Sequence, residues 1–441
     1  MFRKNWISPL IVFVALISGC ETREVSTPTQ PAANSQNTNT NVAPPANTSQ
    51  PALPAHVAAL PVTMPLLDAM LADEAFNSDV RQAVQISDEE LSKIRDVAKN
   101  EVLQLGTVDE DDLTRSTRAS TDKTRKEVEK ILGPQRTDQF FNFIRLRWAG
   151  NGDNLAVTAP NAVPTDTRIV VNAPAYRMDI FRDGRLIKTY KVGIGYPEFP
   201  LPTGLRKANE IIFNPTWTPP DEPWVKGKFK PGEKVEAGSK LNPLGPIKIP
   251  IGLPSLIHGG KVQARLGSFA SHGCVGLTDA LVQDFAAQLA ELSGTPLPLE
   301  KIKGYAKTPS DTENVKLARP VPVELRYETI VVEDGKVTIY RDVYEKDTNT
   351  EENLRRVLEA HGVNFDQLPE SDRTKLLDAV QQMSVGADGK AVDGGNTNGA
   401  NAGNSNTGKV TRNVKGKKEI VIPIASLAGK GYPSPMTVMV K

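Results

Sequence analysis

The stretch Ser271-His272-Gly273-Cys274-Val275 sets a thiol beside an imidazole and a glycine, and a second pair, His258-Gly259, begins fourteen residues before His272. The chain has only two cysteines and four histidines, so this segment concentrates scarce reactive groups. A thiolate is a strong nucleophile near neutral pH, and an imidazole is well suited to deprotonate a thiol. A lone cysteine is most often a small buried hydrophobe, but a core position does not need two His-Gly pairs nearby. The segment therefore predicts nucleophilic chemistry at Cys274.

The residue types around Cys274 match the requirements of acyl transfer through a thioester. If His258 lies close to Cys274, its imidazole accepts the thiol proton, and the resulting ion pair lowers the thiol pKa. The backbone N–H groups of His272, Gly273 and Cys274 can together face a developing oxyanion. Gly273 has no β-carbon and lets the backbone approach a substrate closely. The competing interpretation is a zinc site with Cys274, His258 and His272 as ligands. No second cysteine or acidic ligand pattern supports it, so we expect no metal.

The other cysteine lies at the opposite end of the chain, in a segment typical of export signals. Residues 1–20 combine a basic start, an apolar run from Ile7 to Ile17 and small residues before Cys20. The run is shorter than the roughly 20 apolar residues of a membrane-spanning helix. Residues 16–20 resemble the bacterial lipobox, which implies that Cys20 is lipidated and begins the mature protein. An ordinary cleaved signal and an uncleaved anchor are the alternatives.

Lipidation of Cys20 would leave Cys274 without a disulfide partner in an oxidising compartment, and a free thiol kept there indicates that it is used. We expect a lipid-anchored protein at the periplasmic face, on the outer membrane if the host has one. The formal net charge is +1, so no global charge points to nucleic acid as a partner.

Composition divides the 441 residues into several parts. A disordered tether is expected where Thr, Pro, Asn and Ala dominate, and a linker where Gly and Asn dominate. A capping box at Ser87–Glu90 and apolar residues at helical spacing predict a helical domain before the β-rich part. The expected organisation is a signal peptide at 1–20, a tether at 21–58, a helical domain at 59–155, a catalytic domain at 166–305, a hairpin and helical extension at 306–385, a linker at 386–408 and a basic tail with one strand at 409–441.

The segment 166–300 has the pattern of an α+β domain rich in strands. Apolar and polar residues alternate around Tyr176–Ile180, and Asp183-Gly184 predicts a hairpin turn. A helix with a buried apolar stripe is expected from about Thr278. The predicted fold class is therefore α+β, with a β-rich catalytic domain preceded by a small helical domain and flanked by disordered linkers. We favour a solvated extension for the basic tail, with attraction to anionic wall polymer or lipid as the alternative.

At these residues the chain resembles the L,D-transpeptidase catalytic domain of bacterial cell-wall enzymes. The hallmark of that family is a His-Gly followed, after a loop, by Ser-His-Gly-Cys and an apolar residue, as at His258-Gly259 and Ser271–Val275. The resemblance covers about residues 166–300, and the hairpin at 320–345 resembles an extension seen in some members. Further family landmarks follow in family order: Val171–Pro174, Val192–Gly195, Pro202–Gly204, Asn214–Pro220 and Asn242–Gly245.

The resemblance implies a role for each residue of the motif. Cys274 matches the nucleophile, and His258 matches the general base, held by a backbone carbonyl near Gly259. Ser271, His272 and Gly273 match the residues that shape the site and the oxyanion pocket. The implied donor is a peptidoglycan tetrapeptide stem, from which terminal D-alanine is released. The implied acceptor is an amine of a neighbouring stem, giving a 3-3 cross-link, or of a wall-attached protein. No cofactor is implied.

One position departs from the family pattern, because Gly276 stands where members usually carry arginine or asparagine. A missing arginine removes a planar fork that can bind a carboxylate. The glycine could also be structural, with a positive φ that arginine would resist. Two other functions stay open: a hydrolase on the same fold (an L,D-carboxypeptidase or amidase), and a catalytically weak wall-binding lipoprotein. A papain-like protease is disfavoured because that family places its histidine far downstream of the cysteine.

Overall fold

The computed structural model describes residues 53–105, 116–149, 159, 161–219, 233–252, 254–305, 311–387, 389, 414 and 416–436. The predicted signal peptide with Cys20, most of the tether and nearly all of the Gly/Asn-rich linker lie outside the described residues. Among the helices that the structure describes, none has both the length and the apolar character needed to cross a membrane.

The first described part is helical, as the sequence predicts. Ser87 and Glu90 form the expected capping box: Glu90 N–H donates to Ser87 Oγ at 3.2 Å, and Ser87 N–H donates to Glu90 Oε2 at 3.0 Å. The helices bury one apolar core that includes Phe140, Phe141 and Trp148. They are α1 (Ala55–Ala58), α2 (Met64–Leu71), α3 (Glu74–Val84), α4 (Asp88–Leu105), α5 (Thr117–Leu132) and α6 (Pro134–Trp148).

The helical part begins before the predicted end of the tether. Residues 55–58 form α1, and Val57 is buried in the same core as α2 to α6. The Pro- and Ala-rich composition that predicts a tether through residue 58 also suits a short helix with a single buried valine. The core that buries this valine also includes helices much later in the chain, such as α6, so composition does not reveal it.

The β-rich part is built on an eight-stranded mixed sheet in the order β3-β2-β1-β10-β5-β6-β7-β9. The hairpin predicted at Asp183-Gly184 joins β2 to β3. Two pairs in the sheet are parallel, β1 with β10 and β7 with β9. The strands are β1 (Arg168–Asn172), β2 (Arg177–Arg182), β3 (Arg185–Lys191), β5 (Gly204–Phe213), β6 (Ile247–Pro250), β7 (Leu256–His258), β9 (Val275–Gly276) and β10 (Glu313–Arg326); β4 (Ile194–Gly195) and β8 (Phe269–Ser271) form a separate parallel pair.

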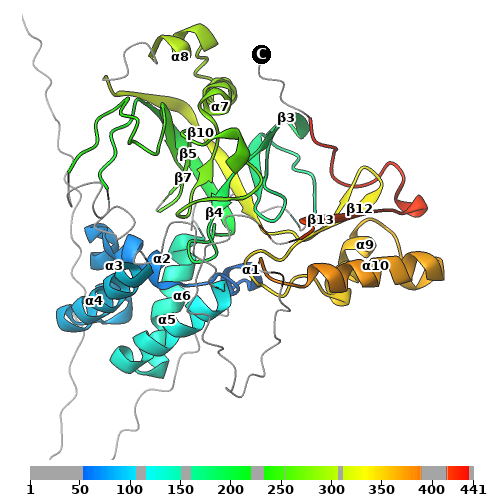
Figure 1. Cartoon of the computed structure of the whole chain (residues 1–441), viewed down its shortest axis with the longest axis horizontal. Helices are drawn as coiled ribbons and strands as arrows, with labels where there is room; N and C mark the ends of the chain where they lie inside the picture. The colour runs from blue at the N-terminus through cyan, green and yellow to red at the C-terminus, as the bar shows by residue number, and fades with distance from the viewer. Residues whose placement is uncertain are drawn as a thin grey trace, which may run out of the picture. The chain divides into compact units, whose positions relative to one another are not determined.

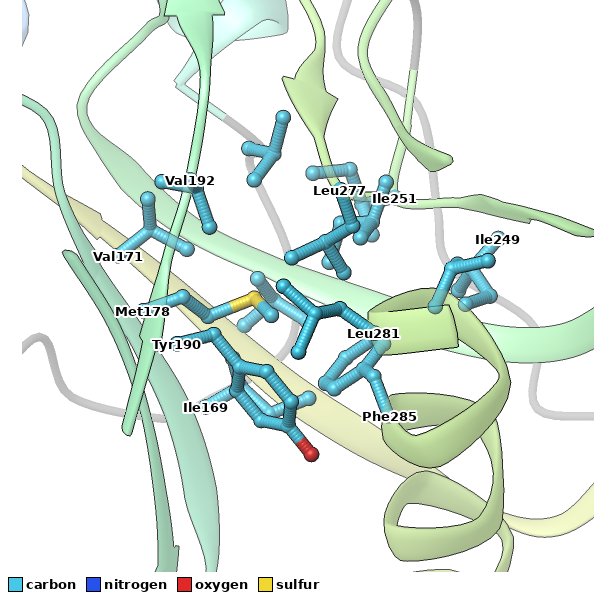
Figure 2. Packing of buried hydrophobic residues seen from close by; sticks show 14 of the residues in the cluster. Ile169, Val171, Met178, Tyr190, Val192, Ile249, Ile251, Leu277, Leu281 and Phe285 are labelled. Carbon is cyan, nitrogen blue, oxygen red and sulfur yellow. The ribbon is translucent and has the colours of Figure 1, made fainter. Parts of the chain in front are cut away.

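Helix α7 (Asp279–Leu292) covers one face of this sheet and fixes the segment that follows Cys274. Thr278 is its N-cap, with the side chain accepting from Leu281 N–H at 3.2 Å. Leu281 and Phe285 project from α7 toward Met178 and Tyr190 of the sheet (Figure 2). The rings of Tyr190 and Phe285 meet edge to face, with centroids 5.7 Å apart. The apolar stripe predicted for this helix is therefore confirmed. Helix α8 (Leu299–Tyr305) follows.

The chain continues into a smaller α/β unit with its own core. Strands β11 (Ile330–Glu333), β12 (Lys336–Tyr340) and β13 (Glu419–Pro423) form an antiparallel sheet. Helices α9 (Glu351–Ala360) and α10 (Glu370–Met383) lie beside β12 and β13 and close the core (Figure 1). Short 3-10 helices lie at Gln263–Arg265, Phe365–Gln367 and Ala425–Leu427.

The preference for a solvated C-terminal tail is wrong for its described residues. The predicted strand forms as β13, and Ile422, Ile424 and Leu427 are buried in the core of the smaller unit. Tyr432 packs edge to face against Phe181 of β2, with ring centroids 5.6 Å apart. The apolar residues of the tail therefore bind it to both sheets, whereas its basic residues suggest solvation when the sequence is considered alone.

A tyrosine after β12 connects the smaller unit to strand β4, beside the predicted motif. The hydroxyl of Tyr344 donates to Gly195 O at 2.8 Å, and its ring stacks with Phe269 and Tyr327. Tyr344 is 1% exposed, so removal of the hydroxyl leaves a buried carbonyl without this donor.

We predict that Tyr344→Phe lowers the free energy of unfolding by about 1–3 kcal/mol, the cost of a buried polar group left unbonded. Tyr176→Phe is the matched control, because the buried Tyr176 hydroxyl has no hydrogen-bond partner among the described residues. Its stability should stay within about 0.5 kcal/mol of the wild type. Urea unfolding of the full chain measures both. Equal effects of the two substitutions would show that the Tyr344 bond contributes nothing.

Candidate active site

The segment that carries Cys274 is a tight turn held by one serine. Ser271 Oγ donates to Cys274 O at 2.5 Å and accepts the Cys274 N–H at 3.0 Å. Ser271 ends β8 and is 4% exposed, so the bonds are shielded from water. Gly273 has φ 88°, a left-handed conformation that side chains rarely adopt. The serine and the glycine together fix the backbone at the cysteine.

The turn changes the expected set of oxyanion donors. The sequence predicts that the N–H groups of His272, Gly273 and Cys274 act together, but the Cys274 N–H is bonded to Ser271 Oγ. The Gly273 N–H has no acceptor in the part of the chain that the structure describes. The Gly273 N–H, unlike that of Cys274, is therefore available to a developing oxyanion.

His258 lies at the end of β7, next to the strand that follows the cysteine. In the β7–β9 pair, His258 is opposite Gly276, two residues after Cys274, so side-chain alternation gives His258 and Cys274 the same face. His258 Nδ1 lies 2.7 Å from Gly259 O. A carbonyl only accepts, so this contact favours the tautomer that carries its proton on Nδ1 and keeps a lone pair on Nε2; the backbone of Leu244 also favours a proton on the ring. The backbone carbonyl implied by the family resemblance is thus present at Gly259.

Removal from water favours the neutral form of both groups, more firmly for His258, which is 3% exposed, than for Cys274, which is only partly buried. It lowers the pKa of His258 to about 3, and the Lys261 ammonium adds to this effect. Burial also raises the pKa of the Cys274 thiol, although the Leu256 N–H and Lys261 partly oppose the rise. The direction of the shift at Cys274 is opposite to the lowering of the thiol pKa that an ion pair with His258 would produce. The desolvated site favours an uncharged thiol and an imidazole that can accept a proton when the reaction begins.

The Gly259-Gly260 segment explains why His258 keeps its orientation. A β-carbon on Gly259 would lie 2.9 Å from Val282 Cγ1, so only glycine fits beneath α7. Gly260 N–H donates to Asp279 Oδ1 at 2.7 Å. The start of α7 therefore anchors the carbonyl that accepts from the imidazole. The predicted site role of Gly259 has a specific physical reason, which is close packing.

His272 lies between two aromatic rings. Its ring meets Phe199 edge to face with centroids 4.6 Å apart, and Tyr196 at 5.2 Å. The loop that carries these rings is held from the helical part: Thr117 Oγ1 donates to Pro197 O at 2.6 Å, and Thr63 Oγ1 donates to Glu198 O at 2.8 Å. The two rings fix the position of His272, and its site-shaping role stays a prediction. The helical part thus contacts Glu198, the residue before Phe199.

At Gly276, where the sequence departs from the family pattern, the side chain of a lysine fills the space beside the glycine. Gly276 does not have a positive φ, so the backbone-strain explanation is wrong. A β-carbon there would lie 2.8 Å from Lys261 Cγ and 3.0 Å from Lys261 Cε. Lys261 is half-buried and influences the pKa of both Cys274 and His258. The glycine therefore makes room for a different cation beside the nucleophile.

Within the described ranges, no group of three or more His, Cys, Asp or Glu side chains is arranged to hold a metal ion.

Comparison with known families gives one match, which covers the segment that carries this site. Residues 166–322 match the YkuD family, the L,D-transpeptidase catalytic domain. This segment is an L,D-transpeptidase catalytic domain. No protein with a curated description matches the chain.

Solved structures similar to this segment include three L,D-transpeptidase structures. An Enterococcus faecium L,D-transpeptidase mutant shares 16% identity, with TM-score 0.24, over 36% of this chain and 50% of the other. The Mycobacterium smegmatis L,D-transpeptidase shares 16% identity, with TM-score 0.22, over 36% of this chain and 58% of the other. The E. faecium catalytic domain acylated by ertapenem shares 16% identity, with TM-score 0.23, over 37% of this chain and 98% of the other. The chain thus spans about half the length of the longer enzymes. The family match, not these likenesses, supports the assignment.

The sequence did not indicate three contacts of the transpeptidase site. Leu256 lies across from Cys274 through the pairing of the β7 and β9 backbones, so its side chain gives no signal. Phe199 and Lys261 reach the site through loops whose course depends on the whole domain. The Gly-Gly-Lys run after His258 is the one local signal, because it places a cation within three residues of the base.

We predict that alkylation of Cys274 by iodoacetamide accelerates continuously from pH 7 to above pH 8.5. The reagent reacts with the thiolate, and the raised pKa of Cys274 keeps the thiolate scarce at neutral pH. Rates are measured on a Cys20→Ser chain, in which Cys274 is the remaining thiol. The same chain in urea is the control and should level off near the ordinary thiol pKa of about 8.5. A plateau between pH 5 and 8 in the folded protein would reveal an ion pair and contradict the account.

We also predict that Lys261→Met slows this alkylation roughly two- to tenfold at pH 8, because loss of a cation that lowers the Cys274 pKa raises it by up to about one unit. Methionine keeps the apolar stem over Gly276, so the change is mainly one of charge. Lys301→Met, on the exposed side of α8, is the control and should react like the wild type. An unchanged rate in Lys261→Met would remove Lys261 from the electrostatics of the thiol.

Proposed function

We propose that this chain is a lipid-anchored peptidoglycan L,D-transpeptidase that acts at the periplasmic face. The observation that supports this most is the pairing of a fixed Cys274 turn with a buried, neutral His258 whose Nδ1 faces Gly259 O. Such a pair is suited to attack on a carbonyl, because the imidazole accepts the thiol proton as the bond to carbon forms. The match of residues 166–322 to the transpeptidase catalytic domain gives the substrate class.

In the proposed first half-reaction, the donor is a tetrapeptide stem, and its third residue supplies the carbonyl. Sγ of Cys274 forms a bond to this carbonyl carbon while His258 Nε2 takes the thiol proton. The Gly273 N–H stabilises the oxyanion. The C–N bond to the terminal D-alanine then breaks, and the imidazolium gives its proton to the departing amine. The result is a thioester on Cys274 and free D-alanine.

In the second half-reaction, an acceptor amine attacks the thioester. The C–S bond breaks, His258 takes a proton from the attacking amine, and the thiolate of Cys274 regains it. An acceptor on a neighbouring stem gives a 3-3 cross-link, and an acceptor on a wall-attached protein gives covalent anchoring. Water in place of the amine would make the protein a hydrolase. Every step uses groups of the chain itself, so the mechanism requires no cofactor.

The assignment predicts a specific product from disaccharide-tetrapeptide. The wild-type chain should yield dimers that lack one D-alanine, identified by mass, together with free D-alanine. Cys274→Ala should yield neither, because no other described residue supplies the nucleophile. A second probe is ertapenem, which acylates the similar E. faecium domain; the wild type should gain its mass and Cys274→Ala should not. Tripeptide alone would assign hydrolysis, and intact substrate with no acyl adduct would contradict the proposal.

The anchoring part of the proposal predicts that Cys20→Ser releases the protein from the membrane fraction or leaves it unprocessed. The wild type should fractionate with membranes and carry a lipid on Cys20, seen as an added mass on the N-terminal peptide. Cys274→Ala is the control and should fractionate like the wild type, since it keeps the lipidation residue. A soluble wild-type protein with an unmodified N-terminus would exclude the lipid anchor.

A further inference from the structure

Arg206, on β5, is a buried cation for which the described part of the chain provides no acceptor. The residue is 4% exposed, and neither Nε nor Nη2 has a hydrogen-bond partner among the described residues. Burial alone lowers the pKa of Arg206, to about 9, with no contribution from a described carboxylate. The guanidinium therefore keeps its charge at neutral pH. Proteins seldom retain a desolvated charge without a counter-ion, because its removal from water is costly.

The unbonded atoms specify the chemistry of a ligand. Nε and Nη2 form one edge of the planar guanidinium and present two parallel N–H groups, which match the two oxygens of a carboxylate. Ser255 Oγ is a second buried polar atom without a partner in the described chain, and Ser255 is 2% exposed. A hydroxyl can add a third donor to the same anion. Buried polar groups are almost always bonded, so these donors together indicate a missing acceptor.

Both residues meet the turn that joins β6 to β7. A β-carbon on Gly252 would lie 2.8 Å from Arg206 Nη1, so the guanidinium packs against this turn. Ser255 N–H donates to Gly252 O at 2.9 Å and closes the turn. The next residue, Leu256, begins β7, and since Ile257 pairs with Val275 in the parallel β7–β9 pair, Leu256 lies across from Cys274. The turn therefore connects the unbonded donors directly to the nucleophile.

We propose that Arg206 and Ser255 form a carboxylate-binding subsite for the donor peptide. This inference rests on the proposed function, because it takes a stem tetrapeptide as the donor. Two carboxylates of such a peptide lie near the reacting carbonyl: that of the terminal D-alanine and that of a diaminopimelate side chain. Gly252, which lies against the guanidinium, is exposed, so solvent reaches the turn beside these donors. The bound carboxylate fixes the peptide relative to Cys274 Sγ.

The test measures peptide binding without turnover, in the full chain with Cys274→Ala. Calorimetric titration with a diaminopimelate-containing tetrapeptide gives its affinity. Addition of Arg206→Met should weaken binding roughly ten- to a hundredfold, the range of a charge-assisted hydrogen bond. Ser255→Ala should weaken it less. Arg185→Met removes an exposed arginine from β3 and should bind like the parent. Equal affinity in the parent and Arg206→Met would overturn the subsite.

Melting temperatures separate a binding role from a structural one. Arg206→Met should melt at the same temperature as the parent or higher, because it removes a buried charge that the described residues leave unpaired. If it fails to fold, two amidated peptides decide the question on the Cys274→Ala chain. One peptide is amidated at the terminal D-alanine and the other at the diaminopimelate side chain. The peptide that lacks the carboxylate bound by Arg206 should bind roughly ten- to a hundredfold more weakly than the free peptide, and this identifies which carboxylate Arg206 binds. Two amidated peptides that bind as tightly as the free one would overturn the proposal.

A failure of the proposed function can be told apart from a failure of the subsite. If the Cys274→Ala chain binds no tetrapeptide, the donor assignment fails, and glutarate becomes the probe, since it carries two carboxylates and no amide. Glutarate should then raise the melting temperature of the parent and not that of Arg206→Met. That outcome retains a carboxylate site at Arg206 without the donor. No shift in either protein would overturn the site itself.

Discussion

The two hydrogen bonds between Ser271 Oγ and the backbone of Cys274 are the constraint on which the rest of the site depends. They use the Cys274 N–H and carbonyl in one tight turn, and Gly273 supplies the positive φ that the turn requires. Because the turn ends β8 and leads into β9, it sets the pairing of β9 with β7. That pairing brings His258 to the face of the sheet that Cys274 shares. The placement of Cys274 and His258 therefore depends on one serine side chain and on the backbone that it holds.

Burial then determines how the two groups share a proton. A solvated Cys–His pair can rest as an ion pair, but desolvation penalises both charges, and the shifts in pKa of His258 and Cys274 have the directions that desolvation predicts. Lys261 opposes this effect at the thiol and reinforces it at the imidazole. In the proposed mechanism the thiolate and imidazolium therefore form only during the reaction, when interactions with the bound substrate can offset the free-energy cost of desolvating the two charges. In the proposed mechanism His258 is the base, and its Nδ1 contact with Gly259 O is what directs the other nitrogen to that role.

Local patterns in the sequence predicted the parts of the fold that depend on neighbours along the chain. The capping box of Ser87 and Glu90, the stripe of α7 and the Asp-Gly hairpin needed only short spacings. The His258–Gly259 carbonyl contact followed from the family resemblance. Other features join distant segments: Arg168 pairs with Glu324 across 156 positions, and Lys261 covers Gly276 because β7 and β9 pair. The raised thiol pKa belongs to this second group, since burial is a property of the whole domain.

Nitrogen-15 NMR of labelled histidine tests the central claim most directly, because it reads the protonation of each ring nitrogen of His258. The signals are assigned by their loss in His258→Gln. The account predicts an imidazole protonated on Nδ1 alone, unchanged from pH 8 down to about pH 4.5, since the pKa of His258 is lowered to about 3. A doubly protonated ring at neutral pH, or a titration near the ordinary pKa of about 6.5, would contradict it.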